Sequence, residues 1–153
     1  MGLIFLELND LIQQIKSYFT DKEVAAIYLF GSYVKGKNRS HSDADIGVLY
    51  PSGLDKVTRF ERGLAYAVEL EELLKFSVDI VDLERADDFF LHQLMLQKII
   101  VLDKDTERRV EFEVRRRREY FDREKFYRMY HQQALKRIDE QELRLKSDAP
   151  ERI

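Results

Sequence analysis

The sequence predicts an α/β fold in which a small mixed sheet is flanked by helices and followed by a long charged helical arm. Short apolar runs rich in β-branched and aromatic residues alternate with longer segments whose apolar residues recur at helical spacing. The composition changes at residue 104, because residues 104–153 contain 15 basic and 12 acidic residues and no glycine, whereas residues 1–103 carry a net charge of −6. We therefore expect an α/β domain over residues 1–103 and a helical arm for partner binding over residues 104–153.

Length and composition exclude several classes of protein. A chain of 153 residues with 44% hydrophobic residues can bury one core, so wholesale disorder is excluded. The net charge of −3 does not indicate a general nucleic-acid binder. The absence of cysteine excludes disulfides and thiolate metal sites and suits a reducing, cytoplasmic location. No apolar run approaches about 18 residues and no signal peptide is recognisable, so we expect no membrane span.

The first half of the chain predicts a helix, two strands and a polar segment between the strands. Residues 3–19 place leucine, isoleucine and phenylalanine near helical spacing and predict a helix. Residues 24–30 form an apolar run that Gly31 ends, which predicts a buried strand. Residues 43–50 alternate partly and end at Pro51-Ser52-Gly53, which predicts a second strand followed by a turn. Residues 32–42 are polar and predict a loop, or a short helix with a turn.

The second half begins with the strongest helical pattern, in residues 54–76. Residues 77–83 predict a third strand, residues 87–98 a short helix capped by Asp87, and residues 99–102 a last extended segment. Residues 104–153 predict one long charged helix or two, and the arginines at 115–118 are expected to pair with acidic neighbours on the same helix surface. The sparse apolar stripe of this arm consists of Val110, Val114, Phe121, Phe126, Tyr127, Tyr130, Ala134, Ile138 and Leu143.

Two carboxylates open the second predicted strand. Side chains alternate along a strand, so Asp43 and Asp45 point to one face, with their Cα atoms about 6.6 Å apart. Two carboxylates placed in this way repel each other and need a cation. Because the available ligands are oxygens, Mg²⁺ is favoured and Mn²⁺ is the alternative. Two such ions can activate an attacking oxygen and stabilise a leaving one, so we expect a site for two ions.

A third carboxylate is expected from the third strand, Val78-Asp79-Ile80-Val81-Asp82. An acidic residue between β-branched neighbours is costly unless it is paired or bound to metal. Asp79 and Asp82 point to opposite faces of this strand, so only one of them can join Asp43 and Asp45. We favour Asp79, which lies inside the strand, and keep Asp82 as the alternative.

The segment after the first strand has the composition of a phosphate-binding loop. Gly31 has no side chain where a phosphate must approach the backbone, and Ser32 offers both an N–H and a hydroxyl. Lys35, Lys37 and Arg39 in the same segment could contact triphosphate oxygens.

Together these features resemble the polymerase-β-like nucleotidyltransferase superfamily. The matching pattern is Gly-Ser, ten residues, Asp-x-Asp and a distal Asp between hydrophobic residues, in the segments LFGSYVKGKNRSHSDADIGVLY and VDIVDL. The small size and the Ser-Asp-x-Asp form are similar to the minimal nucleotidyltransferase (MNT) domain, over residues 24–102. The charged C-terminal helix is similar to that of MNT antitoxins, the partners of HEPN-domain ribonuclease toxins. Gly47 stands where many relatives have a bulkier apolar residue, and we expect it to slacken the strand.

The resemblance implies a fold, a reaction and roles for individual residues. It implies the polymerase-β-like fold and transfer of AMP from ATP to a tyrosine hydroxyl of a cognate HEPN ribonuclease toxin, which silences the toxin. Asp43 and Asp45 would bind both metal ions, and Asp79 would bind the catalytic ion and help to deprotonate the acceptor hydroxyl. Ser32 would hold the β- and γ-phosphates. The residues expected to bind the nucleotide are Gly31, Ser32, Lys35, Arg39 and Ser42.

Two other functions remain open at this point. In the first, the acceptor is a small hydroxylated molecule such as an aminoglycoside, although the charged helical arm makes a poor pocket for it. In the second, the chain is an antitoxin that acts by binding alone, through the apolar stripe of the arm. The intact carboxylate trio argues against the second, because clustered carboxylates without a partner are a liability.

Overall fold

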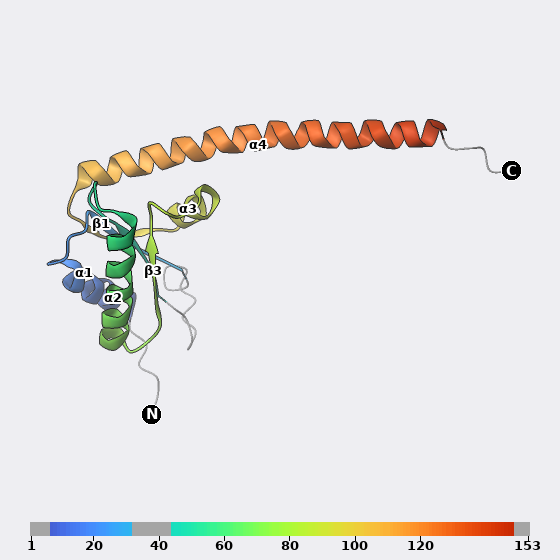
Figure 1. Cartoon of the computed structure of the whole chain (residues 1–153). Coiled ribbons are helices and arrows are strands. Elements are labelled where there is room, and N and C mark those ends of the chain that lie inside the picture. The colour runs from blue at the N-terminus through green and yellow to red at the C-terminus, as the bar shows by residue number, and fades with distance from the viewer. Residues whose placement is uncertain (1–6, 32–43, 149–153) are drawn as a thin grey trace, which may run out of the picture. The chain divides into compact units, whose positions relative to one another are not determined.

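The computed structural model describes residues 7–31 and 44–148 (Figure 1). The chain forms two compact units, Met1–Arg116 and Arg117–Ile153. The first unit contains a sheet, three helices and the first turns of a fourth helix, and the second unit contains the rest of that helix. Within the described ranges, no helix is both long enough and apolar enough to cross a membrane.

The sheet of the first unit has four strands in the order β3-β2-β1-β4. Its strands are β1 (Ala26–Phe30), β2 (Ala44–Leu49), β3 (Val78–Asp82) and β4 (Ile99–Asp103). Strand β1 is antiparallel to both β2 and β4, and β2 is parallel to β3, so the sheet is mixed. Strand β3 therefore lies at one edge of the sheet and β4 at the other.

Aspartate side chains cap the starts of helices in this fold. The helices are α1 (Leu8–Phe19), α2 (Lys56–Leu74), α3 (Asp88–Met95) and α4 (Thr106–Asp148). The Asp55 carboxylate accepts the Thr58 N–H at the start of α2, and the Asp87 carboxylate accepts the Phe90 N–H at the start of α3. At the end of α2, Lys75 adopts a left-handed conformation with φ of 65°.

Both faces of the sheet are largely covered, which explains why the residues of its central strands are apolar except for Asp45. Helices α1 and α2 cover one face, where they pack on alternate strand residues such as Leu29, Ile46 and Val78. Helix α3 and the first turns of α4 cover part of the other face through Leu91 and Phe112. The residues of that second core are Ala25, Ala26, Tyr28, Phe30, Leu49, Leu83, Leu91 and Phe112.

The predicted helices and strands are confirmed in type and order, whereas the predicted loop or short helix over residues 32–42 lies outside the described residues. Helices occupy the predicted ranges 54–76 and 87–98, strands occupy 24–30, 43–50, 77–83 and 99–102, and the arm is a single helix rather than two. The predicted helix over residues 3–19 begins at Leu8, the first residue of α1, and residues 3–6 lie outside the described range. The division at residue 103 stays a prediction, although the structure places α4 as far as Arg116 in the first unit.

Gly47 does not slacken β2, contrary to the expectation from the sequence. It pairs in register with Tyr28 of β1 and Val81 of β3. The space that its missing side chain leaves is filled by the Phe30 ring and Leu83, since a Cβ at position 47 would lie 2.6 Å from Cε2 of Phe30 and 2.9 Å from Cδ2 of Leu83. The glycine therefore allows the phenylalanine ring to pack closely against the strand.

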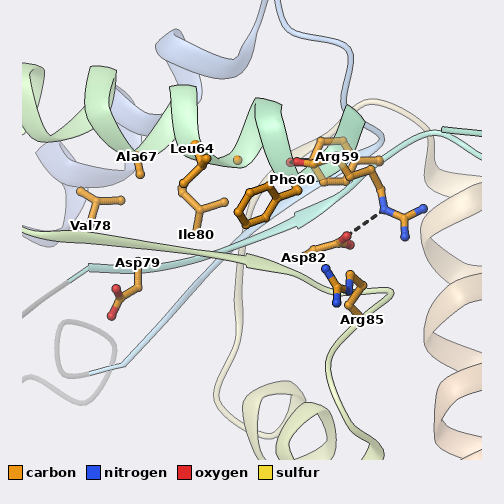
Figure 2. Close-up of a pocket in the computed structure, with 11 residues that line it drawn as sticks. Arg59, Phe60, Leu64, Ala67, Val78, Asp79, Ile80, Asp82 and Arg85 are labelled. Atoms are coloured by element: carbon orange, nitrogen blue, oxygen red, sulfur yellow. Dashed lines mark hydrogen bonds and ion pairs between the residues drawn. The ribbon is translucent and has the colours of Figure 1, made fainter. Parts of the chain in front are cut away.

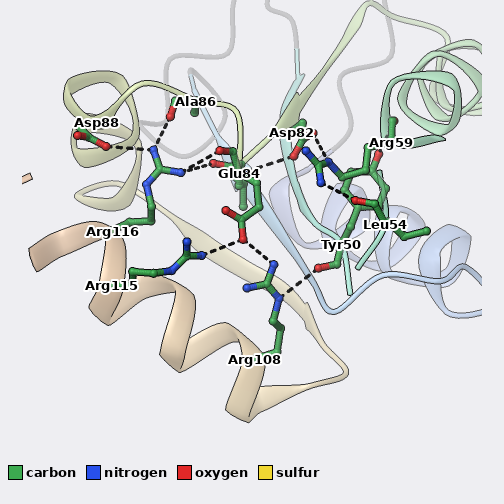
Figure 3. A network of polar contacts seen from close by, with 11 residues as sticks. Tyr50, Leu54, Arg59, Asp82, Glu84, Ala86, Asp88, Arg108, Arg115 and Arg116 are labelled. Carbon is green, nitrogen blue, oxygen red and sulfur yellow. Dashed lines mark hydrogen bonds and ion pairs between the residues drawn. The ribbon is translucent and has the colours of Figure 1, made fainter. Parts of the chain in front are cut away.

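A polar network fastens the first turns of α4 to the β3–α3 connection (Figure 3). The buried Arg116 guanidinium donates to the carbonyls of Leu83, Glu84 and Ala86 and forms an ion pair with Asp88. Arg115 and Arg108 both donate to the Glu84 carboxylate, at 2.9 and 2.6 Å. The arginines at 115–118 were expected to pair within their own helix, but Arg115 and Arg116 form ion pairs with Glu84 and Asp88, which lie outside it.

A second network holds the same helix to β1. Glu113, half-buried in α4, accepts hydrogen bonds from the Tyr28 hydroxyl, Lys98 and Arg109. Burial alone would raise the pKa of Glu113, but the hydrogen bonds from Lys98 and Tyr28 and the nearby positive charges outweigh it and lower the pKa below its usual range. Glu113 therefore joins α4 to the sheet as an ionised carboxylate.

The second unit is a helix with an exposed surface. From residue 117 to residue 147 no side chain is buried, and the larger apolar side chains are exposed. The exposed apolar side chains of this stretch are Phe121, Phe126, Tyr127, Met129, Tyr130, Leu135, Ile138, Leu143 and Leu145.

We predict that Glu113→Gln makes the chain less stable at pH 7, by about 1–3 kcal/mol, because Lys98 and Arg109 lose their anionic partner. A lowered pKa gives stability that is complete above the unfolded value near 4.5 and is lost as the pH falls through the folded pKa. The difference between the variant and the parent should therefore shrink in urea titrations at about pH 3.5. Glu111→Gln, at an exposed position on the same helix, is the control, and an equal loss there would contradict the assignment.

We predict opposite effects for two glycine-to-alanine changes. Gly47→Ala should lower the free energy of unfolding by about 1–3 kcal/mol, because its Cβ would overlap Phe30 and Leu83. Gly63→Ala in α2 should raise it by about 0.5–1 kcal/mol, because its Cβ would make ordinary contacts, 3.6 Å from Ile80, and alanine favours a helix. Urea unfolding measures both, and a neutral Gly47→Ala would show that Phe30 can move at little cost.

Candidate active site

Two of the predicted catalytic carboxylates lie side by side in the sheet. Asp45 of β2 and Asp79 of β3 are register partners in the parallel pair, so their side chains leave the same face of the sheet. This is the face opposite α1 and α2, because Ile46, Val78 and Ile80 point to those helices. Figure 2 shows Asp79 directed away from α2 while Val78 and Ile80 point toward it. Asp45 is half-buried and Asp79 is exposed.

Gly31 makes room for the Asp45 carboxylate. It directly follows β1, and its neighbour Phe30 pairs with Asp45 across the antiparallel ladder. A Cβ at position 31 would overlap Oδ2 of Asp45, and Gly31 has a φ of +93°, which disfavours any residue with a side chain. The backbone of the predicted phosphate-binding segment therefore begins directly against a candidate metal ligand.

The structure does not describe the other predicted site residues. Asp43, Ser32, Lys35, Arg39 and Ser42 all lie in the range 32–43, outside the described residues, and their roles stay predictions. Among the residues that are described, no group of three or more histidine, aspartate or glutamate side chains could hold a metal ion. Asp45 and Asp79 are thus the part of the predicted carboxylate trio that has a defined position.

Asp82, the alternative third carboxylate, belongs to the other face of β3. Its Oδ2 accepts a hydrogen bond from Nε of Arg59 at 2.7 Å, and its Oδ1 accepts the Glu84 N–H at 3.2 Å. Arg59 also donates to the Leu54 carbonyl at 2.7 Å, so the pair fastens the start of α2 to the end of β3 (Figure 3). Asp82 therefore has a structural partner on the other face from Asp45, and the role of Asp79 as the third carboxylate stays a prediction.

A groove along the outer edge of β3 was not expected from the sequence. It has a volume of about 240 Å³ and lies between β3 and α2 (Figure 2). The sequence predicted a helix over residues 54–76 but not the position of its individual side chains, and Phe60 and Leu64 are 59% and 54% exposed. The available signal was the width of the apolar stripe on α2, which exceeds what one face of a sheet can cover. The groove is lined by Phe60, Leu64, Ala67, Val78, Ile80, the ion pair of Arg59 and Asp82, and by Asp79 and Arg85, with Tyr50 and Gly63 completing it.

Comparison with known families identifies the class of protein. The family described as polymerase beta, nucleotidyltransferase matches residues 13–107, which include β1, β2, β3 and both described carboxylates. This chain therefore belongs to the polymerase beta nucleotidyltransferase family.

One curated relative of this chain is a protein adenylyltransferase. The chain is 41% identical over 71 residues to the protein adenylyltransferase MntA of Shewanella oneidensis strain MR-1, a match that covers 46% of this chain and 48% of MntA. The match thus spans about half the length of that curated relative.

Solved structures of toxin–antitoxin proteins are similar over most of this chain. A toxin–antitoxin structure with AMP-PNP is 28% identical, covers 90% of this chain and 98% of its own, and has a TM-score of 0.56. A structure of the toxin–antitoxin MntA-HepT is 25% identical, with coverages of 86% and 95% and a TM-score of 0.53. A third, described as a tri-AMPylated Shewanella oneidensis HEPN toxin in complex with MNT antitoxin, is 26% identical, with coverages of 90% and 95% and a TM-score of 0.50.

We predict that Gly31→Ala displaces the Asp45 carboxylate and lowers the free energy of unfolding by about 1–2 kcal/mol, the cost of a left-handed backbone with a side chain. Gly53→Ala is the matched control, since Gly53 has a φ of +95° but an added Cβ would have no atom within 4 Å. Urea unfolding should show a similar backbone cost for both, while only Gly31→Ala should shift the amide resonances of Asp45 in NMR spectra. If the Asp45 amide resonance did not shift in Gly31→Ala, the close approach of Gly31 to the Asp45 carboxylate would be contradicted.

Proposed function

We propose that this chain is an antitoxin that transfers AMP from ATP to a tyrosine hydroxyl of a cognate HEPN ribonuclease toxin and thereby silences it. The observation that carries the proposal is the pair Asp45 and Asp79, in register and on one face beside Gly31, in a nucleotidyltransferase chain. The relative named protein adenylyltransferase and the solved relatives with AMP-PNP and with an AMPylated HEPN toxin support both the reaction and the acceptor.

The described carboxylates fit a magnesium site. Asp45 and Asp79 offer only oxygen ligands, face the same side of the sheet, and leave one exposed carboxylate, Asp79, open to a ligand. With Asp43 they would hold two Mg²⁺ ions, or Mn²⁺ in their place. When bound, such ions would offset the charge of the triphosphate and make the α-phosphorus a better electrophile.

The residues of the chain would position the reactants and handle the proton. The tyrosine oxygen forms a bond to the α-phosphorus, the bond from that phosphorus to the bridging oxygen of the β-phosphate breaks, and pyrophosphate leaves. Asp79, exposed at the sheet edge, would accept the hydroxyl proton. The backbone at Gly31 and the side chains of Ser32, Lys35, Arg39 and Ser42 would bind the phosphates. Most of the acceleration would then come from positioning.

The arm would bind the toxin. Between residues 117 and 147 the helix α4 buries no side chain and exposes aromatic and aliphatic residues along its length. Exposed aromatic residues of this density are typical of protein interfaces. We assign catalysis to residues 1–103 and toxin binding to residues 104–153, and we place the complex in the cytoplasm, where ATP and the RNA substrate of a ribonuclease are both found.

We predict that Asp45→Asn and Asp79→Asn each abolish transfer of AMP, because an amide neither binds Mg²⁺ as tightly nor accepts the proton. The measurement is the intact mass of the cognate toxin after incubation with this protein, ATP and Mg²⁺, where each transfer adds one AMP unit. Retained transfer in either variant would refute the site.

Asp82→Asn is the matched control, because Asp82 lies on the opposite face of the same strand. It should keep transfer while it lowers the free energy of unfolding by about 1–3 kcal/mol through the loss of its bond with Arg59. If the parent protein binds the toxin tightly but never changes its mass, the chain is an antitoxin that acts by binding alone.

A further inference from the structure

The outer edge of β3, which pairs with no other described strand, lies beside the candidate active site. The Ser77 carbonyl accepts the Ala44 N–H, and the Leu83 N–H is donated to the Val48 carbonyl, so the odd-numbered residues of this stretch turn their backbone groups toward β2. The even-numbered residues Val78, Ile80 and Asp82 therefore direct their N–H and C=O groups to the outside of the sheet.

Some of these outward backbone groups already have hydrogen-bond partners, and others have none among the described residues. The Val78 N–H is donated to the Glu71 carboxylate at 3.1 Å, and the Asp82 carbonyl accepts the Arg85 N–H. The N–H and C=O of Ile80 lie between these two closed ends, and no described residue pairs with them. One residue of an added strand could bond both groups.

The two faces beside this edge differ in chemistry. On the α2 side lies the groove, where Phe60, Leu64 and Ile80 offer apolar surface. On the opposite side lies the Asp79 carboxylate, with its register partner Asp45 on the next strand. Figure 2 shows this arrangement, with Leu64 and Phe60 above β3 and Asp79 below it.

We propose that the acceptor of the transfer reaction binds as an extended segment added antiparallel to the edge of β3. The proposal rests on the proposed function and specifies how that function recognises its substrate. Addition of a strand to an open edge is a common mode of peptide recognition, in which backbone bonds give affinity and alternate side chains give specificity.

The alternation of side chains then determines which acceptor residues face the groove and which face Asp79. A residue that bonds Ile80 points its side chain into the α2 groove, and the next residue of the segment lies opposite Asp79 and points to the Asp79 face. The tyrosine therefore lies opposite Asp79, while the residues directly before and after it point to the groove and are apolar.

Charge also favours an occupant of this kind. The exposed Asp79 and the exposed Arg85 lie toward opposite ends of this edge, with the Asp79 carboxylate on the face away from α2. In an antiparallel segment, Arg85 lies beside residues that precede the tyrosine, so a carboxylate there is favoured. Two acidic residues on β3 itself disfavour the pairing of two copies of this edge.

The test uses the full chain and two synthetic nonapeptides that carry a fluorophore. In one, valine flanks a central tyrosine on both sides and a glutamate precedes them, and in the other serine replaces both valines. Fluorescence anisotropy without ATP measures binding. We expect the valine peptide to bind about tenfold more tightly or better, because a buried apolar side chain contributes at least this factor.

Two further changes test the groove and the backbone separately. Leu64→Lys should remove the preference for the valine peptide, whereas Val68→Lys should leave it intact, since Val68 is similarly exposed at 60% on the same helix but does not line the groove. N-methylation of the residue before the tyrosine should weaken binding about tenfold by removing its bond to Ile80. N-methylation of the tyrosine itself should not weaken binding, because its N–H faces away from β3.

The same peptides then serve as AMP acceptors with ATP and Mg²⁺, and the outcomes separate the two proposals. For transfer, Leu64→Lys should raise KM about tenfold and leave kcat unchanged. Equal binding of the two peptides, or an unaffected KM in Leu64→Lys, would overturn the strand addition even if AMP is transferred. Selective binding of the valine peptide without any transfer, to it or to the toxin, would preserve the groove and refute the proposed reaction.

Discussion

The parallel register of β2 and β3 is the constraint on which the rest of the site depends. It places Asp45 opposite Asp79, and a shift by one residue would turn one of the two carboxylates to the α2 face. The register is held by the cores on both faces, because Ile46, Val78 and Ile80 pack under α1 and α2 on one side and Val81 and Leu83 pack on the other. Two like charges are therefore kept adjacent by apolar packing that would be lost if they moved apart.

The acidic residues of this sheet are sorted by face. Asp82 turns to the α2 side and finds Arg59 there, so its charge is balanced within the protein. Asp45 and Asp79 turn to the other side, where Gly31 lets the chain pass close to the Asp45 carboxylate. A protein that needed charge only for solubility would have no reason to hold this glycine in a left-handed conformation against a carboxylate. The sorting separates a carboxylate that stabilises the fold from the pair on the face of the candidate site.

Helix α4 differs in burial between its two parts. Its first turns are part of the first unit, where the buried Arg116 and the ionised Glu113 bind it to the β3–α3 connection and to β1. Beyond Arg116 no side chain as far as residue 147 is buried, and the larger apolar ones are exposed. Arg116 in the first turns of α4 binds the connection that directly follows β3, the strand that carries the candidate site residue Asp79.

The sequence by itself determined the order and type of the helices and strands, and it indicated Asp43 and Asp45 as a candidate pair of carboxylates. Hydrophobic period and capping residues are local properties, and they were sufficient to predict α2, α3 and the four strands. Alternation along β3 showed that Asp79 and Asp82 cannot share a face, but not which of them meets Asp45. Tertiary structure alone showed that Asp79, and not Asp82, lies beside Asp45. It also decided the partners of Arg115 and Arg116, the packing of the Phe30 ring over Gly47, and the exposure of Phe60 and Leu64 at the groove. Each depends on which residues distant in the chain become neighbours, and a sequence pattern records the period of a segment without recording what packs against it.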